Sequence, residues 1–323
     1  MKYLFIINPV AGQGKGIEQL KNRIHDAFRD LGIAEDNYEI HVSAAHEDAI
    51  RRAREFGESL NGEKGRVYAC GGDGTVSEVV NGIFGFENIA FGVIPIGTGN
   101  DLIRNFPASH NFKDIKEQIQ ASTQKIDLIR YRGMVDGEDT TGYCANMINI
   151  GFDCNVVELA GRLKQKPLIA GSFAYLLAVF GMFIKKKGIA LKITELGKDK
   201  LTGVNVLKDD EMLLCAVCNG SYCGGGIKSS PMSRLDDGKF ELNIINDVSR
   251  MKFMRLFPKF QKGEHLEIPG IEKIVEIRSC KDAVLESNRN WDFFICVDGE
   301  IKKTTGIRVT LLENAMDMVI PGI

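Results

Sequence analysis

A cluster of glycines around a single carboxylate is the part of the sequence best suited to chemistry. It reads Gly71-Gly72-Asp73-Gly74-Thr75 and follows an apolar run, Val67–Cys70. After the cluster, the spacing of apolar residues changes from strand-like to helix-like. Glycines permit positive φ and close backbone approach, so their N–H groups and those of the helix start can converge on an anion. We therefore predict a phosphate site at this turn.

The carboxylate of Asp73 is out of place among anion-binding donors unless it meets a divalent cation or a hydroxyl. Such a partner would suit a nucleotide that is bound together with its metal. The alternative is an ordinary βα turn, in which the glycines supply αL positions and Thr75 or Asp73 caps the helix. A glycine-rich turn alone does not decide between the two.

Two further glycine-rich turns follow apolar runs. Asn8–Gly16 comes after Tyr3–Ile7, and it is not a Walker A loop, since no Gly-Lys-Ser/Thr follows at the required distance. It could face a nucleotide or form a helix entry with a local Asn turn. Gly97–Asp101 comes after the run Phe91–Pro95.

The first third of the chain alternates these apolar runs with helical patterns. Expected strands at Tyr3–Ile7, Tyr38–Val42 (with Ser43 at its end), Val67–Cys70 and Phe91–Pro95 alternate with amphipathic helices. This pattern predicts an α/β fold with a mainly parallel sheet and helices on both faces. Ligands of such sheets lie beyond the carboxyl ends of the strands, where the glycine-rich turns gather.

From about Lys125 the sequence changes to short extended runs separated by turn clusters. This pattern is typical of an antiparallel sandwich and predicts a second, mostly β domain. The expected strands are 126–131, 143–150, 190–194, 212–218, 240–245, 274–277 and 293–297, followed by 307–312 and 318–320, which could belong to either domain.

Composition excludes several classes of protein. The 323 residues carry a formal net charge of −2, which gives no global electrostatic reason to expect a nucleic-acid partner. Several of the eight cysteines lie within apolar runs, which favours free thiols in a reducing cytoplasm. Cys215 and Cys218 have the spacing of half a zinc site, but residues three apart in a strand face opposite sides.

One apolar segment, Leu168–Ile184, raises the question of a membrane span. It falls short of the roughly 20 residues that a span requires and contains two glycines and a serine. We expect a buried or partly exposed amphipathic helix instead. Lys185, Lys186 and Lys187 follow it, either as a solvated helix end or on anionic lipid headgroups.

The motifs in their order resemble those of the diacylglycerol kinase catalytic-domain family, and most of all its soluble bacterial lipid kinases. Gly-Gly-Asp-Gly-Thr is shared with NAD kinases, but its combination with the other motifs is more specific. The matching stretches are Asn8-Pro9 with Gly12, Gly71–Thr75 with Glu78 and Asn81, Gly97–Asp101, Pro231–Phe240 and Val297–Glu300.

The resemblance implies an α/β ATP-binding domain (residues 1–128, with a return at 308–323) and a β-sandwich lipid-substrate domain (129–307). It implies that Glu300 accepts the proton, that Asp298 helps to position the catalytic magnesium, and that Asp73 holds the nucleotide's magnesium or its water. A structural magnesium site is implied at Asp237, with backbone oxygens near Arg234 and Lys239. The implied ATP contacts are Asn8, Pro9, Val10, Ala11, Gly12, Ser43, Gly71, Gly72, Asp73, Gly74, Thr75, Val76, Ser77, Glu78 and Thr98.

The function that follows is an ATP- and Mg²⁺-dependent lipid kinase, which converts diacylglycerol to phosphatidic acid. We expect a cytoplasmic enzyme that is peripheral at the inner membrane surface, with a lipid substrate, transient membrane contact and no nucleic-acid partner. A homodimer is left open. The alternatives are an NAD kinase that uses the same glycine loop, and a catalytically silent nucleotide or lipid sensor.

Overall fold

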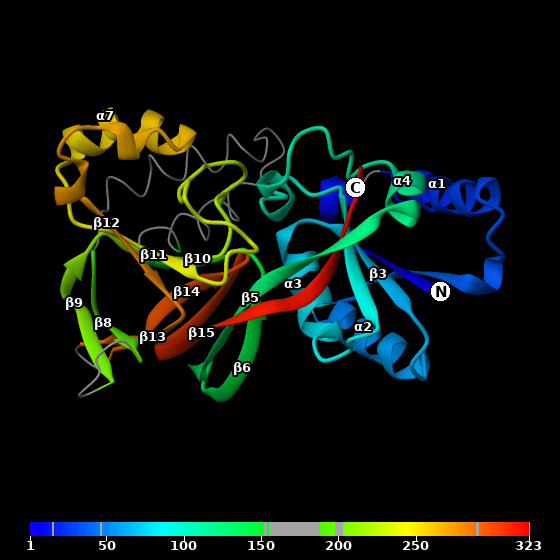
Figure 1. Cartoon of the computed structure of the whole chain (residues 1–323), viewed down its shortest axis with the longest axis horizontal. Coiled ribbons are helices and arrows are strands. Elements are labelled where there is room, and N and C mark those ends of the chain that lie inside the picture. The colour runs from blue at the N-terminus through cyan, green and yellow to red at the C-terminus, as the bar shows by residue number, and fades with distance from the viewer. Residues whose placement is uncertain are drawn as a thin grey trace. The chain divides into compact units, whose positions relative to one another are not determined.

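Apolar strands alternating with amphipathic helices build the first part of the chain (Figure 1). The structure is a computed structural model that describes residues 1–14, 16–45, 47–151, 154, 188–197, 203–288 and 291–322. The chain divides into two compact units, residues 1–126 with 314–323, and residues 127–313. Two strands, β5 (Ser122–Val135) and β15 (Glu300–Ile320), contribute residues to both units.

The first unit is built on a parallel sheet in the order β2-β1-β3-β4, with the end of β15 added beside β4. This confirms the predicted α/β fold. Its strands are β1 (Lys2–Ile7), β2 (Tyr38–Val42), β3 (Gly65–Gly71) and β4 (Ile89–Pro95); its α-helices are α1 (Ile17–Asp30), α2 (Asp48–Ser59), α3 (Asp73–Ile83) and α4 (Ile115–Gln120); and its 3₁₀ turns are η1 (Ala11–Gly14), η2 (Glu35–Asn37) and η3 (Leu102–Asn105).

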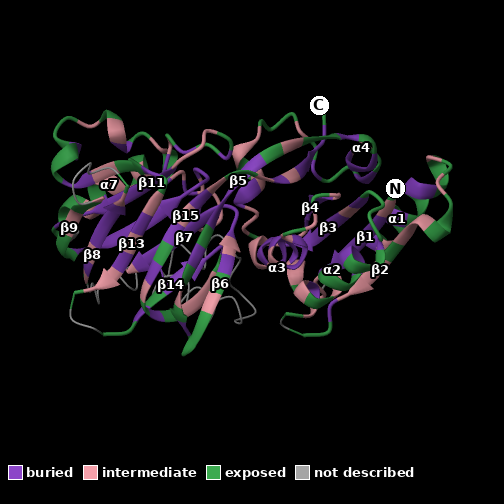
Figure 2. Cartoon of the chain, turned by 60° about the horizontal axis from the view of Figure 1, so that its bottom comes forward, coloured by how far each residue is buried: buried purple, intermediate pink, exposed green. Residues whose placement is uncertain are grey.

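Helices cover both faces of this sheet (Figure 2). The apolar stripes of α1 and α4 share one buried cluster with Phe5 and Tyr68 of the sheet, whose rings stack 4.7 Å apart. On the other side α2 and α3 pack against each other and against β1 and β3. Arg66 donates to the carbonyl oxygens of Gln118, Ile119 and Ala121, and so satisfies the C-terminal end of α4.

The second unit is mostly antiparallel β structure, as predicted. One path of strands runs β12-β11-β10-β7-β14-β15, another runs β15-β13-β8-β9, and β5 forms a hairpin with β6. The bounds are β6 Glu138–Cys144, β7 Met147–Gly151, β8 Ile189–Leu196, β9 Val204–Met212, β10 Leu214–Cys218, β11 Phe240–Ile245, α7 Arg250–Lys262, η4 His265–Glu267, η5 Ile271–Lys273, β12 Val275–Cys280, β13 Asp282–Ser287 and β14 Phe293–Val297.

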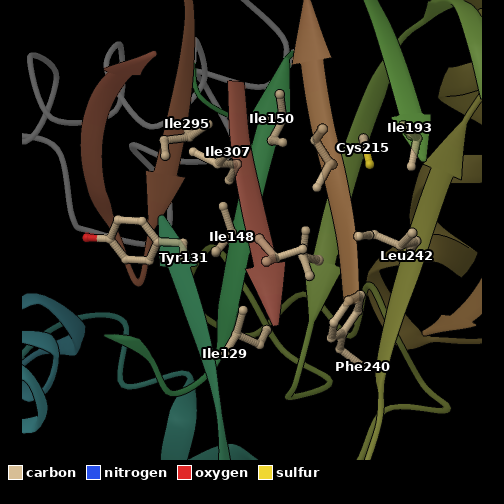
Figure 3. Packing of buried hydrophobic residues seen from close by; sticks show 14 of the residues in the cluster. Ile129, Tyr131, Ile148, Ile150, Ile193, Cys215, Phe240, Leu242, Ile295 and Ile307 are labelled. Atoms are coloured by element: carbon tan, nitrogen blue, oxygen red, sulfur yellow. The ribbon is translucent and has the colours of Figure 1, made fainter. Parts of the chain in front are cut away.

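Branched aliphatic side chains fill the core of this unit. Figure 3 shows Ile148 and Ile150 of β7, Cys215 of β10 and Leu242 of β11 within one cluster, and all four are fully buried. All eight cysteines of the chain are buried and free, which matches their predicted behaviour as small hydrophobes.

Several expected elements differ from those observed. The run 143–150 is not one strand, because the ladder breaks at Ala145 and Asn146 between β6 and β7. The run 212–218 is divided between β9 and β10, whereas 307–312 and 318–320 belong to one strand, β15. The helix expected after Thr75 begins earlier, at Asp73. Helix α7 and the strands β9 and β13 were not predicted.

No helix in the described ranges is both long enough and apolar enough to cross a membrane. The segment Leu168–Ile184 and the lysines at 185–187, on which the sequence prediction of an amphipathic helix rested, lie outside the described residues.

Candidate functional site

Three glycine-rich turns meet at the carboxyl edge of the parallel sheet, because β1, β3 and β4 are neighbours. The amide of Asn8 donates to the Cys70 carbonyl at 3.0 Å, and the amide of Gly97 donates to the Gly71 carbonyl at 3.0 Å. The Asn8 side chain also donates through Nδ2 to Thr75 Oγ1 at 3.1 Å. The turns after the three strands are thus joined directly to one another.

Two of the glycines are required by close approach of these turns. A Cβ added at Gly97 would lie 2.5 Å from the Cα of Gly72, so only glycine lets the two backbones meet. A Cβ at Gly12 would lie 2.8 Å from the Ile96 carbonyl oxygen, and Gly12 has a φ of 61°. Glycine was predicted to allow close backbone approach at these turns. The approaching groups are the Gly72 backbone at Gly97 and the Ile96 carbonyl at Gly12.

The carboxylate of Asp73 joins the turn after β3 to the loop after β4. Its Oδ1 accepts a hydrogen bond from the Asp101 amide at 2.6 Å, and the amides of Asn100 and Leu102 also donate to this carboxylate. Burial raises the pKa of Asp73 above its ordinary value, and the backbone donors partly offset that rise. In this structure Asp73 accepts hydrogen bonds from backbone amides of the glycine-rich loop that follows β4.

The start of α3 is a candidate site for an anion. Its N-cap is Gly72, whose lack of a side chain leaves the helix without a side-chain cap. Helix-start amides that have no intrahelical partner bind phosphate well, and the macrodipole adds to that attraction. The alternative in which Thr75 or Asp73 caps the helix is wrong, because both residues lie inside the helix and its N-cap is Gly72.

The other predicted ATP contacts divide into two groups. Those in the turns, such as Val10 and Thr98, are exposed near the sheet edge, and Asn8 accepts a hydrogen bond from the Val10 amide in a local Asn turn. Ser43, Val76 and Ser77 are buried. The hydroxyl of Ser43 donates to the Ile7 carbonyl at 3.1 Å, and Glu78 accepts from the Glu47 amide at 3.4 Å.

Asp298 lies in the tight turn between β14 and β15, with φ values of 45° at Asp298 and 92° at Gly299. Its buried carboxylate accepts hydrogen bonds from the amides of Ala145 (2.8 Å), Asn146 (3.1 Å) and Met147 (3.0 Å). Burial raises the pKa of Asp298, and these donors oppose the rise. Asp298 therefore joins its own turn to the break between β6 and β7.

Glu300 is the first residue of β15 and pairs with Val297 across the turn. Its side chain is partly exposed, and Lys302 Nζ lies 3.4 Å from Glu300 Oε2. The pKa of Tyr131 is raised by burial first, and by nearby negative charge that includes Glu300 and Asp298. A carboxylate, an ammonium and a phenol are thus gathered at the start of β15.

The predicted metal site contains one buried oxygen that fits a cation. Asp237 Oδ1 is buried and has no hydrogen-bond partner in the described part of the chain, while Lys239 Nζ lies 3.7 Å from Asp237 Oδ2. Burial and the nearby carboxylates of Glu241 and Asp127 raise the pKa of Asp237, and Lys239 lowers it. A divalent cation would satisfy this oxygen and relieve the repulsion.

The remaining ligands of a metal ion at that site would have to be backbone oxygens. No three acidic, histidine or cysteine side chains of the described residues form a metal-binding group. The Arg234 guanidinium is exposed, with Nε 3.4 Å from Asp236 Oδ1, so only the backbone of Arg234 could serve as a ligand. The backbone-oxygen role that the resemblance implied for Arg234 and Lys239 stays a prediction.

Sequence reasoning missed two supporting residues. Asp127 Oδ2 accepts the Gly238 amide at 2.8 Å, and Asn219 Nδ2 donates to the carbonyls of Asp127 (2.8 Å) and Ala145 (2.7 Å). A lone aspartate in the apolar run 126–131 was the one signal for Asp127, while Asn219 follows the run 212–218 with no distinguishing pattern.

Comparison with known proteins assigns both halves of the chain. Residues 2–131 match the family model described as "Diacylglycerol kinase catalytic domain". Residues 146–320 match that described as "YegS C-terminal NAD kinase beta sandwich-like domain".

Individual proteins agree with these models. The chain is 29% identical over 265 residues to a diacylglycerol kinase of Bacillus subtilis (strain 168), covering 81% of this chain and 79% of that protein. A crystal structure of a diacylglycerol kinase from Bacillus anthracis str. Sterne matches with a TM-score of 0.67 at 21% identity, covering 99% and 97% of the two chains. Yeast NADH kinase complexed with NADH shares the fold at a TM-score of 0.51 and 11% identity, covering 100% of this chain and 84% of that one.

The two family models together span nearly the whole chain, in the order that the motifs predicted. The chain therefore belongs to the diacylglycerol kinase catalytic-domain family, with the YegS-type β-sandwich domain at its C-terminal side.

Proposed function

We propose that this protein is an ATP- and Mg²⁺-dependent lipid kinase that transfers the γ-phosphoryl group of ATP to the hydroxyl of diacylglycerol, forming phosphatidic acid. The observation that carries the proposal is the joined set of glycine turns at the carboxyl ends of β1, β3 and β4, in a chain of the diacylglycerol kinase family. We further propose that it is a cytoplasmic enzyme that acts at the inner membrane surface.

The nucleotide's phosphates are assigned to the turns and to the uncapped start of α3. Backbone amides fixed by their neighbours stabilise phosphate charge without reorganisation, which is the main requirement of phosphoryl transfer. Asp73 acts here as a positioning residue, since its carboxylate holds the loop of Gly97–Asp101 against the Gly72 turn. The alternative, that Asp73 also holds the nucleotide's metal or its water, stays a prediction.

The acceptor hydroxyl is assigned to Glu300. Its partly exposed carboxylate can accept the hydroxyl proton, and Lys302 Nζ lies 3.4 Å from Glu300 Oε2. Asp298, whose carboxylate is taken up by the backbone of Ala145–Met147, fixes the turn from which Glu300 projects.

Magnesium has two proposed places. Bound with ATP, it would neutralise part of the charge on the transferred phosphoryl group. Asp237 and the backbone oxygens of Arg234 and Lys239 would hold a second, structural ion, for which the unpartnered Oδ1 of Asp237 is the support.

A screen of lipid acceptors tests the proposed function. Purified protein, ATP and MgCl₂ are incubated with mixed micelles of diacylglycerol, ceramide, a sphingoid base or phosphatidylglycerol, and with NAD in a parallel reaction. Mass spectrometry should find phosphatidic acid from diacylglycerol. Phosphorylation of NAD alone would support the NAD kinase alternative, and ATP-dependent thermal stabilisation without any transfer would support the silent sensor.

A further inference from the structure

Helix α7 (Arg250–Lys262) carries a strong positive charge. It contains five basic residues and no acidic residue, in a chain whose net charge is −2. The first acidic residues after the helix are Glu264 and Glu267, which follow its αL C-cap, Gly263. The basic residues of the helix are Arg250, Lys252, Arg255, Lys259 and Lys262.

One face of α7 packs on the second unit. Phe253, Leu256, Phe257 and Phe260 contact a buried cluster from β10, β11 and β12, and Figure 1 shows the helix lying on the outside of these strands. Both ends of the helix are fixed, because Ser249 caps the start through its hydroxyl and the amide of Gly263 donates to the carbonyls of Lys259 and Phe260. Because these four side chains are packed against the strands, the helix presents its opposite face outward.

The opposite face of α7 presents apolar and basic side chains together. The side chains of Met251 and Met254 are 65% and 52% exposed. With Pro258 they follow the helical spacing i, i+3, i+7, and Arg255 and Lys262, at i+4 and i+11, lie on the same face. We call these five residues the α7 face, and all five are exposed. Figure 2 shows exposed residues along α7.

Further basic groups flank the α7 face. Lys252 and Lys259 are exposed at its edge, about two helical turns apart. Lys228 lies against the C-terminal end of the helix, where its amide donates to the Gln261 carbonyl at 3.0 Å and its Nζ lies 5.7 Å from the centre of the Tyr222 ring. The positive charge of the helix thus extends beyond its own residues.

We propose that the α7 face docks on the surface of an anionic lipid bilayer. Lysine and arginine beside exposed apolar side chains are the pattern of helices that lie in the membrane interface, where the cations meet anionic headgroups and the apolar groups enter the acyl boundary. A nucleic acid would match the charge but offers no environment for Met251 and Met254. A second copy of the chain would bring two like-charged helices together. The proposal requires no catalytic activity.

Vesicle sedimentation without nucleotide tests this assignment. The wild-type protein should bind phosphatidylglycerol-containing vesicles in 0.1 M salt, bind phosphatidylcholine vesicles far more weakly, and lose most binding at 0.5 M salt. Arg255→Gln with Lys262→Gln should lower the partition coefficient roughly 25-fold, at about fivefold for each cation removed. Met251→Ser with Met254→Ser should lower it roughly tenfold or more, in low and high salt alike.

A charge-matched control is available in the first unit. Arg54→Gln with Lys64→Gln removes two exposed cations outside α7 and should leave vesicle binding within twofold of the wild type. Circular dichroism and the thermal midpoint confirm that each variant folds; because the substituted side chains are exposed, both should match the wild type. The salt dependence of the wild-type protein tests the electrostatic part without any substitution.

Four results would overturn the proposal. These are unchanged vesicle binding by the α7 variants, equal binding of the wild type to neutral vesicles, a decrease in the control pair as large as in Arg255→Gln with Lys262→Gln, and an affinity for duplex DNA that exceeds that for anionic vesicles. Sedimentation equilibrium adds a fifth: if the α7 variants dissociate a wild-type dimer without changing vesicle binding, the face is an interface between copies of the chain.

Discussion

Replacement of Asp73 by alanine tests whether this carboxylate positions the nucleotide loops or binds metal. In the structure it accepts hydrogen bonds from the amides of Asn100, Asp101 and Leu102, and truncation to alanine removes this acceptor. Asp73→Asn is the matched control, because it keeps the shape of the side chain and one acceptor oxygen. Burial raises the pKa of Asp73 because it disfavours the charged carboxylate. We therefore expect the side chain to stabilise the loop through the hydrogen bonds that its oxygens accept, rather than through its charge.

The size of the effect follows from the three amides. Asp101 and Leu102 are buried, and each unpaired amide there costs about 1 to 1.5 kcal/mol, while the amide of Asn100 is nearer to water and costs less. We expect Asp73→Ala to destabilise the loop by about 3 kcal/mol and Asp73→Asn by about half as much. Nucleotide binding has to order the loop again in Asp73→Ala. If this costs half of the lost free energy, about 1.5 kcal/mol, the affinity for ATP falls roughly tenfold.

Two assays separate the roles. Amide hydrogen exchange by mass spectrometry should show protection of residues 97–105 lost in Asp73→Ala and partly kept in Asp73→Asn. Calorimetric titration with ATP should show the same loss of affinity in EDTA as with MgCl₂, since a positioning residue acts with or without metal.

The reasoning would be refuted by full protection of residues 97–105 in Asp73→Ala together with unchanged affinity for metal-free ATP. A loss of affinity seen only with MgCl₂ would instead favour the role that the sequence predicted, a carboxylate that holds the nucleotide's magnesium or its water.

Three further predictions concern Glu300, Asp237 and His265. Glu300→Gln should keep ATP affinity but lower turnover by roughly 10² to 10⁴, measured as steady-state phosphatidate formation. Asp237→Asn should abolish the rise in thermal midpoint that MgCl₂ alone gives the wild type, because the buried oxygen that fits the ion is altered. Burial lowers the pKa of His265 to about 4, below its unfolded value of about 6.5. The unfolded state therefore binds more protons between these values, so the stability of the second unit should fall by about 2 kcal/mol from pH 7 to pH 5. His265→Phe should remove that loss in urea unfolding.

Contrary outcomes are equally specific. Full turnover in Glu300→Gln would reject it as the proton acceptor, and Lys302→Gln serves as the control for its ion pair. An equal magnesium response in wild type and Asp237→Asn would reject the metal site. If His265→Phe loses as much stability as wild type between pH 7 and pH 5, the buried histidine is not the cause.

The parallel sheet could be predicted because its signals are local. β2 occupies the predicted residues Tyr38–Val42, where apolar and polar residues alternate. β1 differs from its prediction by one residue and is an apolar run that a glycine-rich turn follows. The positions of the glycine turns follow from the strands. Their mutual hydrogen bonds, such as that from Asn8 to Thr75 across 67 residues, leave no mark on the sequence around either residue.

Elements whose form depends on distant partners were predicted poorly. The break at Ala145 and Asn146 exists because the carboxylate of Asp298, about 150 residues later, takes their amides out of the ladder. Helix α7 contains Pro258, whose missing N–H normally argues against a helix interior, and its basic outer face interrupts the apolar pattern. The prediction separated 307–312 from 318–320, whereas β15 continues through both; Asn314, which lies between them, has a φ of 50°.

The candidate site shows the same division. The glycine-rich turn predicted a role for Asp73, and the resemblance to the family implied one for Asp298. Which groups they bind could not be predicted, because the amides of Asn100–Leu102 and of Ala145–Met147 come from other loops. Residue type and motif order therefore indicated the candidate positions, and the tertiary structure supplied the hydrogen-bond partners of these side chains.

Transfer of ³²P from [γ-³²P]ATP to diacylglycerol in mixed micelles tests the central claim most directly. The wild-type protein with MgCl₂ should form labelled phosphatidic acid, and addition of EDTA should stop the reaction. Absence of label in diacylglycerol and every other lipid hydroxyl, from folded protein that binds ATP, would contradict the assignment of this chain as a lipid kinase.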